Sequence, residues 1–126
     1  MDTRSPAPET LLTELGLAES EDGMWTDDDG HTGAVLTRIG VFVGWIDVIW
    51  PTTLPARLLK GVSHVPSELS DDNRPAAITR ALDEARRHRQ AAVRRCKYCG
   101  EFVMPGHMHE KTTCMGCAVR HLGVVY

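Results

Sequence analysis

Apolar side chains recur along this chain in patterns that predict a short helix, a β-rich segment and a long helix. Residues 10–17 place three leucines on one side of about two helical turns. Residues 34–39 and 41–50 are dense in β-branched and aromatic side chains, and they predict two strands or one long strand bent at a glycine bulge. An aromatic strand end followed by Asp and Gly within residues 25–30 predicts a hairpin turn.

The longest helix is expected at residues 75–95, where alanine is frequent and no glycine or proline follows Pro75. Its apolar stripe should bury against the sheet and consists of Ile78, Leu82, Ala85 and Ala92. Residues 52–73 show no clear period, so we expect irregular structure with a short helical turn near residues 55–59. Residues 1–8 hold two prolines and no apolar period, and they predict a flexible tail.

Charge is distributed unevenly along the 126 residues. The formal net charge of −3 would by itself argue against a nucleic-acid partner. Residues 1–73, however, carry 4 basic and 13 acidic side chains, a net of −9, whereas residues 74–126 carry 10 basic and 4 acidic side chains, a net of +6. The basic residues are densest at the end of the long helix and just beyond it, at Arg86, Arg87, Arg94, Arg95 and Lys97.

The sequence shows neither a membrane-spanning run nor the pattern of a secretory signal. The longest apolar run, residues 41–50, is far shorter than the roughly 18 residues that a span needs. The first residues lack a positive segment followed by an apolar one. We therefore expect a cytoplasmic protein without a membrane partner, in which thiols stay reduced.

The four cysteines form two Cys-x2-Cys pairs separated by 14 residues. Each pair can offer two thiolates to one tetrahedral ion, so the sequence predicts a structural zinc site held by Cys96, Cys99, Cys114 and Cys117. A redox Cys-x-x-Cys motif and two pairs of buried free thiols are the alternatives. Residues 96–126 contain few large apolar side chains, and a bound metal would supply the folding free energy that they lack.

The C-terminal run from Cys96 to Tyr126, CKYCGEFVMPGHMHEKTTCMGCAVRHLGVVY, resembles a zinc-ribbon or treble-clef finger. In such fingers a knuckle and hairpin supply two cysteines, and the second pair opens a short helix. The ending is also similar to the C-termini of small uncharacterised proteins of actinobacteria and their phages. The resemblance covers about 31 residues and implies a zinc fold, without assigning an activity.

Histidines near the cysteines raise two further possibilities. A set of three cysteines and one histidine would result if His109 or His121 replaced a cysteine. His107 or His109 would activate water if the segment were a nuclease of the HNH kind. Four thiolates leave no open position for water, so we expect a structural ion and no catalytic residues.

These observations predict an α+β fold in four segments: a flexible tail (1–8), an acidic, mainly β domain (9–73), a connecting basic helix (74–95) and a zinc-binding module (96–126). The first functional hypothesis is a nucleic-acid-binding or transcription-associated protein that uses the basic residues named above. The alternative is a protein-interaction adaptor with a structural zinc, whose acidic surface is formed by Glu19, Glu21, Asp22, Asp27, Asp28 and Asp29.

Overall fold

The computed structural model describes residues 7–70 and 72–125, and it shows an α+β protein. The chain forms two compact units, which are described separately. Unit 1 consists of Met1–Ile46 and Leu59–Arg89, and unit 2 of Asp47–Leu58 and Gln90–Tyr126. Each unit thus combines two separate stretches of chain, which differs from the contiguous segments expected from the sequence.

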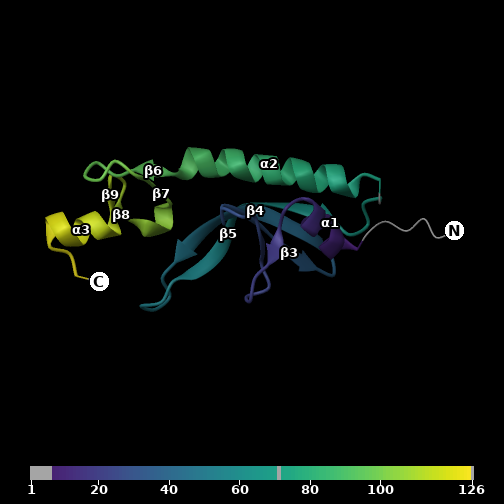
Figure 1. The fold of residues 1–126 in the computed structure, drawn as a ribbon, viewed down its shortest axis with the longest axis horizontal. Helices are drawn as coiled ribbons and strands as arrows, with labels where there is room; N and C mark the ends of the chain where they lie inside the picture. The colour runs from purple at the N-terminus through teal and green to yellow at the C-terminus, as the bar shows by residue number, and fades with distance from the viewer. Residues whose placement is uncertain (1–6, 71, 126) are drawn as a thin grey trace. The chain divides into compact units, whose positions relative to one another are not determined.

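The sheet is a meander in which each strand lies beside the next one in the sequence (Figure 1). It follows helix α1 (Pro8–Glu14), and its five strands are β1 (Ala18–Glu19), β2 (Trp25–Thr26), β3 (Thr32–Thr37), β4 (Gly40–Ile49) and β5 (Ala56–Pro66). The first four pair antiparallel. Trp25 lies opposite Ala34, and Ala34 lies opposite Val43, so these three positions share one face.

The two-strand interpretation of residues 34–50 is confirmed, and a single bent strand is wrong. Strands β3 and β4 form a hairpin closed by Thr37, whose hydroxyl donates to the carbonyl of Gly40 at 2.9 Å. Gly40 has a φ of +140°, and a side chain there would collide with the carbonyl of Val65. The hairpin expected at residues 25–30 is also present, between β2 and β3.

Strand β5 corrects the expectation for residues 52–73. A helical turn was expected near residues 55–59, but an 11-residue strand begins there instead. This strand is last in the sheet order, and most of its residues are half-buried or exposed, so the apolar alternation that marks a strand is missing. Gly61 lies within it at a φ of +59°, which further interrupts the pattern.

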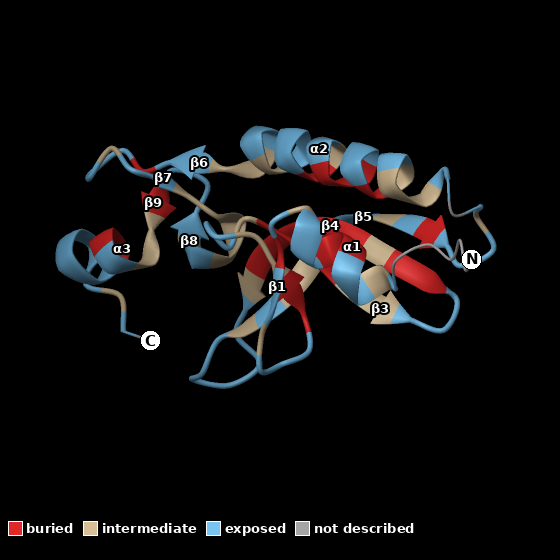
Figure 2. Cartoon of the chain, turned by 45° about the vertical axis from the view of Figure 1, so that its right-hand side comes forward, coloured by how far each residue is buried: buried red, intermediate tan, exposed pale blue. Residues whose placement is uncertain are grey.

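Helix α2 (Arg74–Ala92) lies along one face of the sheet in unit 1 and buries one side against it (Figures 1 and 2). Its buried residues are Ile78, Ala81, Leu82 and Ala85, and Ala92 is only half-buried. Ile78, Ala81 and Leu82 join Leu11 and Leu12 of α1 and Val43 of β4 in one apolar core. The helix ends three residues before the expected Arg95, because Arg94 and Arg95 enter a strand.

The N-terminal helix begins at Pro8, within the segment expected to be a tail, and ends at Glu14 rather than at residue 17. Residues 1–6 of that expected tail lie outside the described residues. Within the described part of the chain, no helix has both the length and the apolar character that crossing a membrane requires.

Candidate metal centre

Two short hairpins and a helix build the C-terminal part of unit 2. The first hairpin pairs β6 (Arg94–Arg95) with β7 (Phe102–Val103), and the second pairs β8 (Met108–Glu110) with β9 (Thr113–Cys114). A single 3-10 turn, η1 (Pro105–His107), lies between them, and helix α3 (Met115–Leu122) follows directly. Each Cys-x2-Cys pair therefore lies at a change of direction, one in a hairpin loop and one at a helix start.

The first cysteine pair lies in the tight loop between β6 and β7. The N–H of Cys96 donates to the carbonyl of Glu101 at 2.9 Å, and the N–H of Gly100 donates to the carbonyl of Cys96 at 2.8 Å. Gly100 has a φ of +74°, a conformation that glycine adopts without steric cost. The loop thus turns both sulfur atoms of the pair toward one point.

The second pair begins helix α3. Cys114 is the N-cap residue, and its Sγ accepts the N–H of Cys117 at 3.4 Å. The N–H of Cys114 in turn donates to the Sγ of Cys96 at 3.4 Å, which joins the two turns. Backbone N–H groups directed at sulfur favour the thiolate form that a metal binds.

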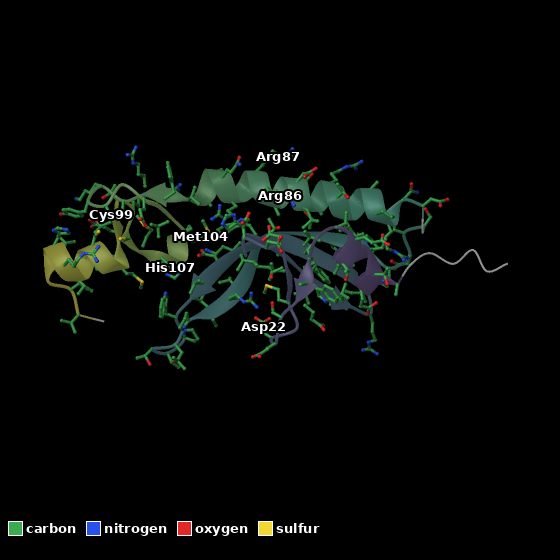
Figure 3. All side chains as sticks on the ribbon, viewed as in Figure 1. Asp22, Arg86, Arg87, Cys99, Met104 and His107 are labelled. Atoms are coloured by element: carbon green, nitrogen blue, oxygen red, sulfur yellow. The ribbon has the colours of Figure 1, made fainter. Side chains whose placement is uncertain are left out.

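All four Sγ atoms lie within 4.8 Å of one another. Cys96 and Cys117 are buried, Cys114 is partly buried, and Cys99 is exposed (Figure 3). A tetrahedral zinc with Zn–S bonds of about 2.3 Å places its sulfurs about 3.8 Å apart, so small side-chain adjustments bring this cluster to that geometry. The four predicted ligands are therefore brought together, and they suit a soft, tetrahedrally bound ion.

The thiols differ in acidity. Hydrogen bonds from the N–H groups of Cys114 and Cys99 lower the pKa of Cys96 to about 6. Burial raises the pKa of Cys117 to about 11, although Arg120 opposes this by donating to Sγ at 3.3 Å. For Cys99 the N–H of Glu101 lowers the pKa, but lost hydration and the thiol of Cys96 outweigh it, and the pKa is raised. A dication is the group that would hold all four sulfurs as thiolates at neutral pH.

Two of the three histidines near the cysteines, His107 and His121, lie in aromatic contacts instead of in the sulfur cluster. His121 stacks on Tyr98, with ring centroids 4.5 Å apart and planes 8° from parallel. His107 contacts Trp50 edge to face at 6.1 Å. Among residues 7–70 and 72–125 the only metal-binding group is the four cysteines, so no histidine replaces a cysteine in it.

Asp47 is a structural residue near the metal centre whose role the sequence pattern concealed. Its side chain is fully buried, and Oδ1 accepts the N–H of Gly106 at 2.9 Å and the N–H of Val48 at 2.8 Å. The indole of Trp50 donates to the carbonyl of Gly106 at 2.8 Å. The end of β4 thereby holds the η1 turn from both sides. The signal was a single charge inside the apolar run 41–50, where an unpaired carboxylate would be costly.

We expect Asp47→Ala to lower the free energy of unfolding by about 1–3 kcal/mol, because two half-buried N–H groups lose their acceptor. Urea denaturation of the zinc-loaded chain measures this. Asp47→Asn is the matched control, since its amide oxygen can still accept, and it should lose less. An unchanged urea midpoint for Asp47→Ala would contradict this role.

The five basic candidates are all exposed, but they do not belong to one unit. Arg86 and Arg87 lie on the unit 1 part of α2 (Figure 3). Arg94, Arg95 and Lys97 belong to unit 2. Arg86 pairs with Asp83 at 2.9 Å, and Lys97 approaches Glu110 at 4.0 Å. Arg94 and Arg95 donate to backbone carbonyls of Ala91 and Gly100.

No protein-family model, no curated protein and no solved structure matches this chain. The resemblance of its C-terminal segment to zinc fingers and to proteins of actinobacteria and their phages therefore stays a prediction. What the structure establishes is a small protein with a four-cysteine group that can hold a metal ion.

Proposed function

We propose that the four cysteines hold one structural Zn²⁺ and that the ion organises the second half of unit 2. The observation that carries this proposal is the convergence of four Sγ atoms within 4.8 Å from two turns 14 residues apart. The order of loop, hairpin and helix, with the second cysteine pair at the start of α3, supports a treble-clef finger. A reducing compartment such as the cytoplasm would keep these thiols available to the metal.

The proposed ion is structural because its four thiolate ligands would complete the coordination sphere. Catalytic zinc retains a position for water or substrate, and a Cys₄ set offers none. His107, one of the two histidines that would activate water in an HNH-like nuclease, is engaged with Trp50. We accordingly propose a binding protein and not an enzyme.

Nucleic acid is the partner that we propose for the basic residues. Arg86, Arg87, Arg94, Arg95 and Lys97 are all exposed, and residues 74–126 carry a net charge of +6. Arg94 and Arg95 directly precede the first zinc ligand. In each guanidinium, a single nitrogen donates to backbone carbonyls. The remaining N–H groups can contact phosphates, the dominant source of affinity for nucleic acids.

We expect the zinc-loaded chain to bind duplex DNA or single-stranded RNA with an affinity that falls steeply as salt rises. Arg94→Gln and Arg95→Gln should each reduce the slope of log K against log salt by about 1. Fluorescence anisotropy at several salt concentrations measures this, with Arg38→Gln, an exposed arginine of the β3–β4 turn, as the control. Binding that does not depend on salt would overturn the proposal.

A protein partner is the second candidate. Of the six acidic residues predicted to form a surface, all but Asp27 are exposed, and Asp27 is half-buried. Asp22 and Asp27 are partly used in turns, where they accept backbone N–H groups of Met24 and His31. The stronger observation for a protein partner lies in unit 2, where an apolar hollow adjoins the metal centre.

A further inference from the structure

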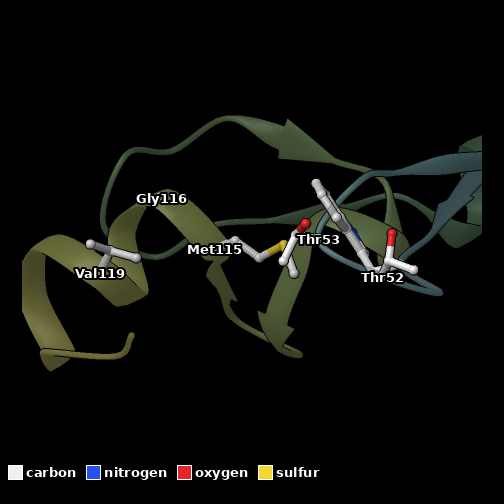
Figure 4. A pocket seen from close by; sticks show the side chains of 6 residues that line it. Thr52, Thr53, Met115, Gly116 and Val119 are labelled. Carbon is white, nitrogen blue, oxygen red and sulfur yellow. The ribbon is translucent and has the colours of Figure 1, made fainter. Parts of the chain in front are cut away.

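Unit 2 contains an apolar hollow beside the second cysteine pair. Its volume is about 460 Å³, and it is lined by Trp50, Thr52, Thr53, Met115, Gly116 and Val119. Figure 4 shows the side chain of Met115 directed toward Thr53, with Val119 farther along α3. This volume lies within the roughly 300–1,000 Å³ of sites that bind ligands, and the lining consists mainly of methyl, thioether and indole groups.

The wall formed by Trp50 is fixed before any ligand arrives. Its indole N–H donates to the carbonyl of Gly106, and His107 packs edge-on against its ring. Trp50 is nevertheless 41% exposed, so a large apolar face remains open to water. A rigid, partly exposed aromatic ring is typical of binding hot spots, because little conformational entropy is lost when a partner covers it.

The facing wall depends on the metal centre. Met115 and Gly116 are the two residues between the ligands Cys114 and Cys117, and Val119 follows two residues later on α3. Coordination of both cysteines would fix the first turn of α3 and thereby the position of this wall. The hollow should therefore keep its shape only when the metal is bound.

Exposed apolar side chains are concentrated in the same unit. Of the ten large ones that the described part of the chain exposes, eight belong to unit 2: Ile49, Trp50, Leu54, Tyr98, Phe102, Val119, Leu122 and Val125. Two of the eight, Trp50 and Val119, line the hollow itself. Isolated exposed apolar residues are ordinary, whereas a contiguous apolar patch marks an interaction site. An apolar partner surface would remove this area from water.

Charge indicates the chemistry of the partner. Unit 2 has six Lys or Arg residues against three Asp or Glu residues, and one of those three, Asp47, is fully buried. Arg120 lies next to one lining residue, since its guanidinium is 3.7 Å from the place where Gly116 would carry a Cβ. Arg120 donates to Cys117 with one nitrogen and has further N–H groups for a carboxylate.

We propose that this hollow docks an acidic peptide segment of a partner protein. One large apolar side chain of the segment enters between Trp50 and Met115, and a flanking carboxylate contacts Arg120. The lining itself carries no cationic group, which favours an apolar side chain over a phosphate as its occupant. This interaction is additional to the proposed nucleic-acid binding. Its contacts are made by Trp50, Met115 and Arg120, which are not among the five basic residues proposed for nucleic acid, although Arg94, Arg95 and Lys97 contribute to the positive charge of unit 2 in both cases.

The test selects peptides from a random 12-residue display library on the zinc-loaded full chain. The expected consensus contains one large apolar residue flanked by Asp or Glu. Titration of the selected peptide should show about tenfold weaker binding to Val119→Glu, which places a like charge in the hollow. Leu122→Glu is the matched control, since Leu122 lies on the same helix, is similarly exposed (45% against 49%) and does not line the hollow.

A second variant, Thr53→Glu, keeps the test decisive if Val119→Glu fails to retain zinc, because Thr53 lies on the other wall in an exposed loop. The proposal is overturned if no acidic consensus appears, or if Leu122→Glu weakens binding as much as the two hollow variants. It is equally overturned if these variants weaken DNA or RNA binding and leave the peptide unaffected. The DNA binding of Arg94→Gln, in contrast, tests only the proposed nucleic-acid function and not the docking of the peptide.

Discussion

Replacing Cys114 by serine should release the metal and unfold residues 94–122, while β3, β4 and α2 of unit 1 stay folded. Cys114 contributes a ligand Sγ, caps α3 and donates its N–H to Cys96, so all three interactions are lost or weakened together. Zinc-finger peptides gain apparent free energies on the order of 10–16 kcal/mol from the ion, which exceeds what this small apolar core can replace.

Zinc content by mass spectrometry and a ¹H–¹⁵N correlation spectrum measure this result. We expect about one zinc per wild-type chain and almost none in Cys114→Ser. Signals of residues 94–122 should collapse to random-coil positions, whereas those of the α2 core around Ile78 and Leu82 should remain dispersed. Met115→Leu is the control, because it alters the same turn without removing a ligand. A variant with full zinc content and dispersed C-terminal signals would refute the structural role of the ion.

Truncating Ile78 to alanine should destabilise unit 1 by about 2–5 kcal/mol. Ile78 is fully buried on α2 and joins Leu12 and Val43 in the apolar core, so its loss leaves a cavity between the helix and the sheet. Stability here rests on packing and not on metal. Chelation of zinc should therefore leave the effect of the substitution unchanged.

Urea unfolding followed by tryptophan fluorescence, with and without chelator, tests this second prediction. Trp25 and Trp45 are buried in unit 1 and report on its core. Thr79→Ala is the matched control, since Thr79 is the next residue of the same helix and is exposed. It should change the free energy of unfolding by no more than about 0.5 kcal/mol. Equal losses of unfolding free energy in Ile78→Ala and Thr79→Ala would show that α2 does not depend on the packing of Ile78 in the core.

Sequence reasoning succeeded where a residue type has few alternative uses. Two Cys-x2-Cys pairs predicted the cluster, because tight turns are the simplest way to bring two sulfurs to one ion. The long apolar stripe at helical spacing predicted α2, because this spacing also has few alternative explanations. The β3–β4 hairpin was one of two alternatives, and the pairing of Thr37 with Gly40 shows which one the chain adopts. The carbonyl of Val65 explains why position 40 is a glycine, since a Cβ there would collide with it.

Sequence reasoning failed where the role of a side chain is set by partners far along the chain. Strand β5 lies at the edge of the sheet and shows no alternation, so its residues resembled a loop with a helical turn. Asp47 looked like an interruption of an apolar strand, whereas its role is set by Gly106, 59 residues later. The hollow could not be predicted either, because Trp50 and Met115 meet only through the folding of unit 2.

The interleaving of the two units has a consequence for how the protein is synthesised and dissected. Residues 47–58 leave the ribosome well before residues 90–122, with which they form unit 2. During that interval Trp50 has no Gly106 to bind and Asp47 has no N–H from the η1 turn, so the segment must wait in solution with its apolar side chains uncovered. Any fragment that starts after residue 58 lacks both side chains, and the four-cysteine segment excised in that way would be an incomplete unit even with its four cysteines intact.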